Sequence, residues 1–409
     1  MPQDRTPPPT ASPAPGGNQG SINHREGAGG GPGPLAGLLV ADFSRILAGP
    51  YCTMLLADLG ATVIKVESPT GDDTRTWKPP VRGEDATYYL AVNRNKRSVV
   101  LDLREPGDLR LAQELAARAD VLVENFRPGG LERFGLDQPA VRARNPRLVY
   151  ASISGFGPGR GASLPGYDLI AQAVSGLMSL TGESDGEPYK TGVAVVDVMA
   201  GMHAAIGILA ALNQVRASGG GQHVQVNLLS SALSGLVNQT SGYVAGGVTP
   251  HRMGNAHPSL CPYEPLPTAD GELVVAVGND GQFRRLCTVL GLSHLPDDPR
   301  FARNHDRTAH RHQLRPLLVE RLVQRPKQEW FRDLVAVGVP CGPINTVAEG
   351  VALADELGLE PVITVGEGSR AVPTVRNPIT LSTTPTHHRL PPPSLDEHGA
   401  DIRAWLSAR

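Results

Sequence analysis

Short apolar runs alternate with stretches of helical spacing along the chain from Leu35 onward. The apolar runs have the length of strands and occupy residues 38–44, 61–67, 97–103, 120–126 and 147–157. Between them, apolar residues recur at helical spacing in 49–60, which ends at a glycine, and in 108–119. This alternation is typical of βαβ units, so it predicts a parallel sheet covered on both faces, with ligand contacts at the carboxyl ends of the strands.

The pattern changes after Leu228. The later elements are a helical stretch, a Pro/Gly-rich loop, a strand and two helices, at 228–247, 254–271, 272–278, 282–292 and 312–325. We therefore expect an α/β fold with a large Rossmann-like domain at 35–228, a smaller α+β domain at 229–325, and a C-terminal segment at 326–409 that returns to the large domain. Residues 1–34 are mostly Pro, Gly, Ser and Ala, and this composition predicts a disordered tail.

Composition excludes several classes of partner. The 409 residues include 38 Lys and Arg and 40 Asp and Glu, a formal net charge of −2, which gives no electrostatic basis for binding nucleic acid or an anionic membrane. The longest apolar candidate, Ile206–Leu212, is far too short to span a bilayer. No CxxC pair or Cys/His cluster is present, so the four scattered cysteines are expected to be reduced thiols of a cytoplasmic protein, and no metal site is expected.

A dinucleotide site is disfavoured although the fold class allows one. The glycines of "GFGPGRG" (155–161) are not followed by a helix, and the first strand carries no GxGxxG motif. Neither a phosphate-binding P-loop nor a GxSxG nucleophile motif occurs.

Asp197 is the one charge in "VAVVDVMAGMHAAIGILAAL" (193–212). As an ordinary structural residue it would be the N-cap of the following helix. Ala200 rules out a capping box, and the helix has more Gly and Ala than its stability requires, which leaves space for another group to approach. In "GYDLIAQA", a purely structural interpretation has Tyr167 half-buried after a turn and Asp168 capping the next helix.

The chain resembles the family III CoA-transferases, which include formyl-CoA transferase, the carnitine CoA-transferases and the α-methylacyl-CoA racemases. From about Leu35 to the C-terminus the motifs keep the family's order and spacing. They are "LLVADFSRILAGPYCTMLLADLGATVIKVESPTGDDTR", "NRNKRSVVLDL", "DVLVENFRPG", "NPRLVYASISGFG", "GYDLIAQA", "VVDVMAGMHAAIGILAAL" and "RMGNAHPSLCPY".

The resemblance implies that Asp197 is the nucleophile of an acyl-CoA:carboxylate CoA-transferase. Asp197 would attack an acyl-CoA thioester, giving an acyl–aspartyl anhydride and then an aspartyl-CoA thioester. The racemases pair the equivalent Asp with a His in "GHD", whereas this chain has "GYD". Tyrosine, with a pKa of about 10, is a poor base at neutral pH, so Tyr167 is expected to contact substrate and transfer is favoured.

The resemblance also implies the CoA contacts and the assembly. CoA is a substrate and not a tightly bound cofactor, and family members form intertwined homodimers. The expected CoA contacts are Ile46, Leu47, Ala48, Leu101, Arg104, Asn125, Phe126, Arg133 and Phe134, and His257 lies in the loop expected to cover the acyl pocket.

Two departures bear on the substrate. Leu47 replaces a Gln of formyl-CoA transferase, and "NAHPSLCP" replaces its glycine-rich loop. Both departures argue against formate and oxalate, and "GNAHPS" resembles members that use succinyl-CoA or other dicarboxylic or branched acyl groups. A racemase and a catalytically silent CoA-binding subunit remain alternatives, and the sequence names neither the acyl donor nor the acceptor acid.

Overall fold

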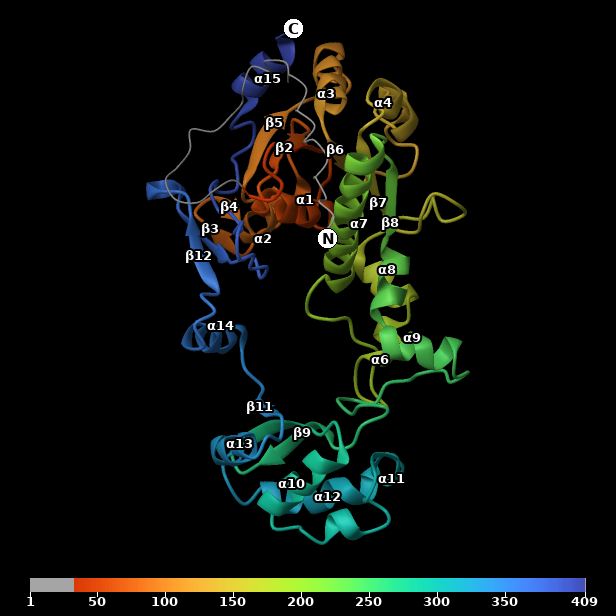
Figure 1. Cartoon of the computed structure of the whole chain (residues 1–409), viewed down its shortest axis with the longest axis vertical. Helices are drawn as coiled ribbons and strands as arrows, with labels where there is room; N and C mark the ends of the chain where they lie inside the picture. The colour runs from red at the N-terminus through yellow and green to blue at the C-terminus, as the bar shows by residue number, and fades with distance from the viewer. Residues whose placement is uncertain (1–32, 409) are drawn as a thin grey trace, which may run out of the picture.

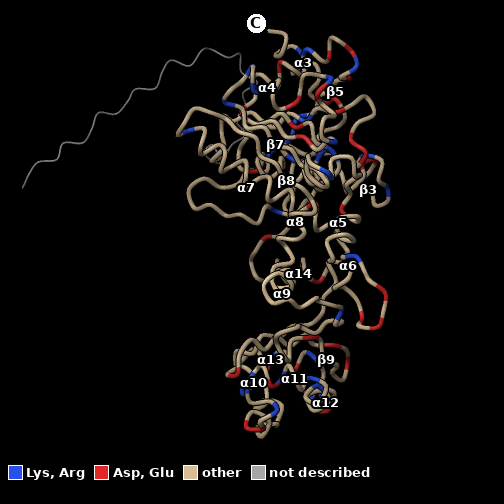
Figure 2. Tube along the Cα trace, turned by 90° about the vertical axis from the view of Figure 1, so that its right-hand side faces the viewer, with Lys and Arg blue, Asp and Glu red and all other residues tan. Residues whose placement is uncertain are grey.

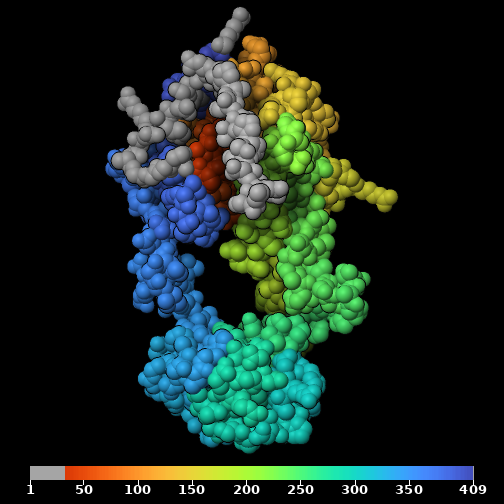
Figure 3. Space-filling view, in the orientation of Figure 1, coloured from red at the N-terminus to blue at the C-terminus, as the bar shows by residue number. Residues whose placement is uncertain are grey.

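The chain forms two lobes joined by two separate connectors, and the computed structural model describes residues 33–408. The connectors leave an opening between the lobes, so the chain has the shape of a ring (Figures 1 and 3). Acidic and basic residues are interspersed over both lobes (Figure 2). Residues 1–32 of the expected tail lie outside the described residues.

The upper lobe is built on a six-stranded parallel sheet with the order β5-β2-β1-β6-β7-β8. Five of the strands were predicted, and they are β1 (Leu39–Asp42), β2 (Thr62–Glu67), β5 (Lys96–Val100), β6 (Val121–Glu124) and β7 (Val149–Ser154). The edge strand β8 (His223–Asn227) was not predicted. Its "HVQVN" sequence carries polar residues at alternate positions and lies directly between two helices, which hides the strand signal.

Helices cover both faces of this sheet. Residues of α1 (Ala48–Asp58) and α7 (Val195–Ser218) share one apolar core with alternate residues of the strands. The opposite face packs against α3 (Pro106–Arg118), α4 (Gln138–Arg144) and α15 (Gly399–Ser407). The predicted α/β architecture is confirmed, and it leaves the carboxyl ends of β1, β6 and β7 free to form a site.

The central helix α7 is longer and more apolar than the sequence analysis allowed. Among residues 33–408 it alone is long and apolar enough to cross a membrane by length and composition, contrary to the expectation that no stretch reaches that length. The buried residues of α7, such as Ala200, Ala204 and Ile208, belong to the core under the sheet. This face of the helix is therefore a core element of the upper lobe.

The lower lobe is an antiparallel sheet of order β11-β10-β9 packed against helices. Its elements are β9 (Tyr263–Thr268), β10 (Gly271–Ala276), α10 (Asp280–Val289), α11 (Asn304–Ala309), α12 (Arg311–Leu322), α13 (Lys327–Ala336) and β11 (Cys341–Pro343). The lobe continues past the expected boundary at 325, because Trp330 and Leu334 lie in its core and β11 pairs with β10.

The two connectors run between the lobes in opposite chain directions (Figure 1). The descending connector contains α5 (Asp168–Val174), α6 (Leu177–Leu180), α8 (Leu228–Gly235) and α9 (Val237–Val244), and the ascending connector contains α14 (Val347–Glu356). The C-terminal segment then adds β12 (Val362–Val365), β13 (Val372–Val375) and α15 to the upper lobe, beside β3 (Val81–Arg82), β4 (Asp85–Ala86) and α2 (Thr87–Val92). Asn377 donates to buried Asp58, and Arg403 pairs with Asp108, so this return is fixed by polar contacts.

Candidate active site

A cavity of about 480 Å³ opens at the carboxyl ends of β1, β6 and β7. Eight of the residues expected at the site line it, and they come from four separate segments of the chain. They are Ile46, Leu47, Ala48, Asn125, Phe126, Arg133, Tyr167 and Asp197. A cavity of this size is typical of small-molecule sites, and the carboxyl edge of a parallel sheet is where ligands bind in such folds.

Asp197 lies in the first turn of α7 and is not its N-cap. The N-cap position belongs to Ala194, which has no capping side chain. Asp168 supplies the missing acceptor, because its Oδ1 accepts hydrogen bonds from the backbone N–H groups of Val196 (2.8 Å) and Asp197 (3.2 Å). Asp168 therefore caps α7 from a neighbouring element, and not its own helix α5 as the structural interpretation expected.

The position of Asp168 changes the chemistry of Asp197. Burial raises the pKa of the Asp197 carboxyl, and the nearby negative charge of Asp168 raises it further, to about 7. Gln172 donates to Asp168 Oδ2 at 2.6 Å and so fixes the carboxylate in place. Asp197 can thus exist in both protonation states near neutral pH, and its anion is more basic than an ordinary aspartate.

Tyr167 is exposed at the rim of the cavity and not half-buried, with 59% of its surface accessible. A close backbone crossing places it there. A Cβ on Gly155 would lie 2.6 Å from the Cα of Gly166, so only glycines allow the chain after β7 to touch the segment that carries Tyr167. A second tyrosine, Tyr88 of α2, is affected by the same carboxylates. Burial raises the pKa of its hydroxyl, and the negative charges of Asp197 and Asp168 raise it further, to about 12.

Three arginines and the N-terminus of a helix also line the cavity. The guanidinium groups of Arg45 and Arg133 lie over the rings of Phe126 and Phe134, and Arg127 also lines the cavity. Helix α1 begins at Ala48 on the cavity wall, with no capping side chain and no acid in its first turn. Arginines and an uncapped helix N-terminus both favour phosphate or carboxylate groups.

Four expected site residues lie outside the cavity lining. Leu101 is buried in the core between the sheet and α3, and the Phe134 side chain packs against the same core. Arg104 is exposed and forms a two-pronged pair with Asp102 (2.9 and 2.7 Å). His257 belongs to the loop leading into the lower lobe, where its carbonyl accepts from Arg311 and its ring contacts Tyr263.

The structure adds residues that sequence reasoning missed, namely Arg45, Arg127 and Asp168. Arg45 directly precedes Ile46 in "SRILAG", and Arg127 directly follows Phe126 in "ENFRPG". Because both neighbours were expected CoA contacts, the two arginines could have been predicted to lie at the site. Asp168 caps α7 from 28 residues earlier in the chain, so no local sequence pattern predicts this contact.

Within residues 33–408, no group of three His, Cys, Asp or Glu side chains is placed to hold a metal ion, and the four cysteines are unpaired.

Comparison with known proteins identifies the family. The model of CoA-transferase family III matches residues 35–399. The chain belongs to this family. The resemblance seen in the sequence motifs is therefore confirmed, and the protein is a CoA-transferase.

Similar proteins cover almost the whole chain. The succinate–glutarate CoA-transferase of Agrobacterium fabrum is 45% identical over 91% of this chain and 96% of its own length. The human succinyl-CoA:glutarate CoA-transferase is 41% identical over 90% of this chain and 85% of its own. A CaiB/BaiF family protein from Brucella suis has a solved structure that matches with a TM-score of 0.82 and 46% identity, covering 92% of this chain and all of that one.

Proposed function

We propose that this CoA-transferase moves CoA between an acyl-CoA thioester and a free carboxylic acid through covalent intermediates on Asp197. The observation that supports it best is the Asp197 carboxyl itself, which lines a cavity that three arginines also line, with its pKa raised to about 7. Near neutral pH a substantial fraction is ionised, and a more basic carboxylate is a better nucleophile.

The steps balance without any other reactant. An Asp197 oxygen attacks the thioester carbonyl carbon, the C–S bond breaks, and CoA leaves as its thiolate. The thiolate attacks the aspartyl carbonyl of the mixed anhydride, which releases the first acid as a carboxylate and leaves an aspartyl-CoA thioester. The acceptor carboxylate then displaces CoA to form a second anhydride, and the thiolate attacks its acyl carbon, giving the new acyl-CoA and free Asp197.

We infer that the substrates are dicarboxylic acids of the succinate and glutarate type. The similar enzymes from Agrobacterium fabrum and human carry these acids in their names. Apolar Leu47 on the cavity wall, and arginines that suit a second carboxylate, agree with such substrates. Racemisation has less support, because no histidine lines the cavity among the described residues and Tyr167 stands at its rim.

The test is the Asp197→Asn variant, which keeps shape and loses the nucleophile. We expect transfer from succinyl-CoA to glutarate to fall at least about 1,000-fold, as removal of a covalent nucleophile generally does. Hydroxylamine added to the wild-type enzyme with acyl-CoA should leave a hydroxamate on the Asp197 peptide, seen by mass spectrometry.

The control is Asp401→Asn on α15, an exposed carboxylate remote from the cavity, which should keep wild-type turnover. Near-normal turnover by Asp197→Asn, with deamidation at that position excluded by mass spectrometry, would contradict the covalent mechanism. A matrix of acyl-CoA donors and acids would contradict the substrate inference if oxalate or formate were the preferred acceptor.

A further inference from the structure

The cavity wall contains a strained residue. Ile46 connects β1 to α1 and has a φ of +71°, in the left-handed region that β-branched residues rarely adopt. Such a conformation is strained and persists only where the surroundings enforce it. Because Ile46, Leu47 and Ala48 together line the cavity, the conformation of Ile46 decides which way this segment faces.

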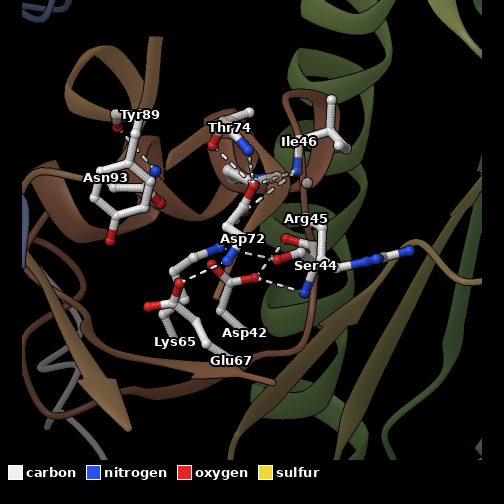
Figure 4. Close-up of polar contacts among 12 residues, drawn as sticks. Asp42, Ser44, Arg45, Ile46, Lys65, Glu67, Asp72, Thr74, Tyr89 and Asn93 are labelled. Carbon is white, nitrogen blue, oxygen red and sulfur yellow. Dashed lines mark hydrogen bonds and ion pairs between the residues drawn. The ribbon is translucent and has the colours of Figure 1, made fainter. Parts of the chain in front are cut away.

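Side chains from outside the loop hold its backbone (Figure 4). The Ile46 N–H lies 3.3 Å from both carboxylate oxygens of Asp72. The carbonyl of Ser44 accepts from Lys65 Nζ at 3.0 Å, and the N–H and carbonyl of Arg45 bond the amide of Asn125 at 2.9 and 2.7 Å. The loop geometry is therefore set by polar side chains from other segments, of which Asp72 and Lys65 lie outside the cavity lining and Asn125 lies within it.

Asp72 is itself fixed by a buried charge. Lys65 Nζ lies 2.8 Å from Asp72 Oδ2, and both side chains are completely inaccessible to solvent. Burial alone would raise the pKa of Asp72, but the attraction of Lys65 and the hydrogen bonds from Lys65 and Thr74 outweigh it, so the pKa is lowered. Burial likewise opposes the charge of Lys65, and Asp72, Asp42 and Glu67 together raise its pKa. The pair is thus ionised, and neither member touches the cavity.

We propose that the buried Asp72–Lys65 pair is a positioning device for CoA binding, which holds the N–H of Ile46 and thereby fixes the first loop in its binding conformation. This inference rests on the proposed function, because it takes the cavity to be the CoA site. Because a buried ion pair contributes little net stability, the main consequence of this pair is the loop geometry that it enforces.

The experiment is a double-mutant cycle on Asp72 and Ile46, read by calorimetric titration of the free enzyme with CoA. In Asp72→Asn, one of the two acceptor oxygens becomes an NH2 donor, so the side chain can no longer accept from both Lys65 and the Ile46 N–H, and we expect the Kd for CoA to rise about tenfold. Ile46→Gly adopts positive φ without strain, and alone it should raise the Kd less than about threefold. In the I46G background, D72N should add less than a twofold change.

Two further variants separate positioning from folding. Asp58→Asn removes the carboxylate of another buried ion pair, with Arg94, at the far end of α1. It should lower Tm as much as D72N does and leave the Kd for CoA unchanged. Thr74→Val keeps both charges and removes one 2.8 Å hydrogen bond to Asp72, so it should raise the Kd about threefold in a well-folded protein.

The outcomes distinguish the two hypotheses. A wild-type enzyme that does not bind CoA would refute the proposed site itself. If the wild-type enzyme binds CoA, and D72N and T74V bind it with the wild-type Kd, positioning by Asp72 is refuted and the proposed site still stands. A full tenfold effect of D72N in the I46G background would show that Asp72 does not act through the strained loop.

Discussion

Two neighbouring carboxylates, Asp168 and Asp197, have different roles at the candidate active site. Asp168 accepts hydrogen bonds from the backbone N–H groups of Val196 and Asp197 at the start of α7, so its carboxylate lies close to the partly buried side chain of Asp197. The first residue stabilises the helix end and the second is made basic by burial and by its neighbour. One geometric arrangement therefore provides both a cap and an activated carboxylate.

This arrangement predicts the pH dependence of transfer. The nucleophile must be ionised and its pKa is raised to about 7, so kcat/KM for the acyl-CoA should rise with pH and level off above about pH 8. Asp168→Asn removes the neighbouring negative charge, which should move the midpoint to lower pH. Initial rates between pH 5 and 9 measure both profiles, with Asp401→Asn as the control. A flat wild-type profile, or an unmoved midpoint in Asp168→Asn, would contradict the assignment.

Sequence patterns identified those site residues that their immediate neighbours in the chain mark out. Asp197 stood out because a charge interrupts an apolar stretch, and Tyr167 because it follows the motif glycine. The roles of Asp72, Lys65 and Asp168 had no such signal, since each depends on contacts between separate segments. Leu101 and Arg104 show the converse, because the family motif placed them near CoA while their side chains lie in the core and on an exposed ion pair.

At the scale of elements, the close crossing of α1 and α7 sets the distance between the two sides of the cavity. Both helices contribute to one core, and a Cβ on Gly201 would lie 2.6 Å from the carbonyl oxygen of Ala48. Ala48 begins α1 at the cavity wall, and Asp197 lies one turn before Gly201 in α7. The small residues that the sequence analysis attributed to space for an approaching group serve here to bring two helices together.

The variant Gly201→Ala tests this packing. The added methyl group must push α1 away, so we expect a loss of about 1–3 kcal/mol in unfolding free energy and a weaker affinity for CoA. Gly242→Ala is the matched control, because that glycine lies inside α9 with no atom within 4 Å of an added Cβ. It should be neutral or stabilise slightly. Equal stability of the two variants in urea unfolding would show that the contact is not tight.

The elements themselves were largely predictable, and their exceptions have physical causes. Strands buried on both faces gave clear apolar runs, whereas β8 at the sheet edge has polar residues at alternate positions. The lower lobe extends beyond its expected end because β11, a three-residue strand containing Gly and Pro, completes its sheet. Pairing of this kind is not encoded in local hydrophobicity.

At the scale of the whole molecule, two parts of the expected site lie on different lobes of the ring. The cavity lies in the upper lobe, whereas His257, expected to cover the acyl pocket, contacts Arg311 and Tyr263 of the lower lobe. An opening separates the two lobes (Figures 1 and 3). We propose that two copies interlock, so that the lower lobe of one covers the cavity of the other. The intertwined dimer expected from the sequence would bring His257 to a cavity in this way.

The surface of α7 supports such a dimer. Met202, Ile206 and Leu209 recur at helical spacing on its exposed side, and Ile206 is 64% accessible in the single chain. Exposed apolar positions in a row are typical of surfaces that another protein covers. The core of the upper lobe covers one apolar side of α7, and the other apolar side would be covered by a second copy of the chain.

The apolar row on α7 is expected to lie in the dimer interface. We expect light scattering at micromolar concentration to give twice the chain mass of 43.2 kDa for the wild-type protein. Ile206→Glu places a charge in the apolar row, because burying an unpaired carboxylate is costly, and it should yield monomers that retain their secondary structure and lose transfer activity. Ile206→Val keeps the row apolar and should remain dimeric and active. A wild-type monomer with full activity would mean that one ring suffices, and a dimer unaffected by Ile206→Glu would place the interface elsewhere.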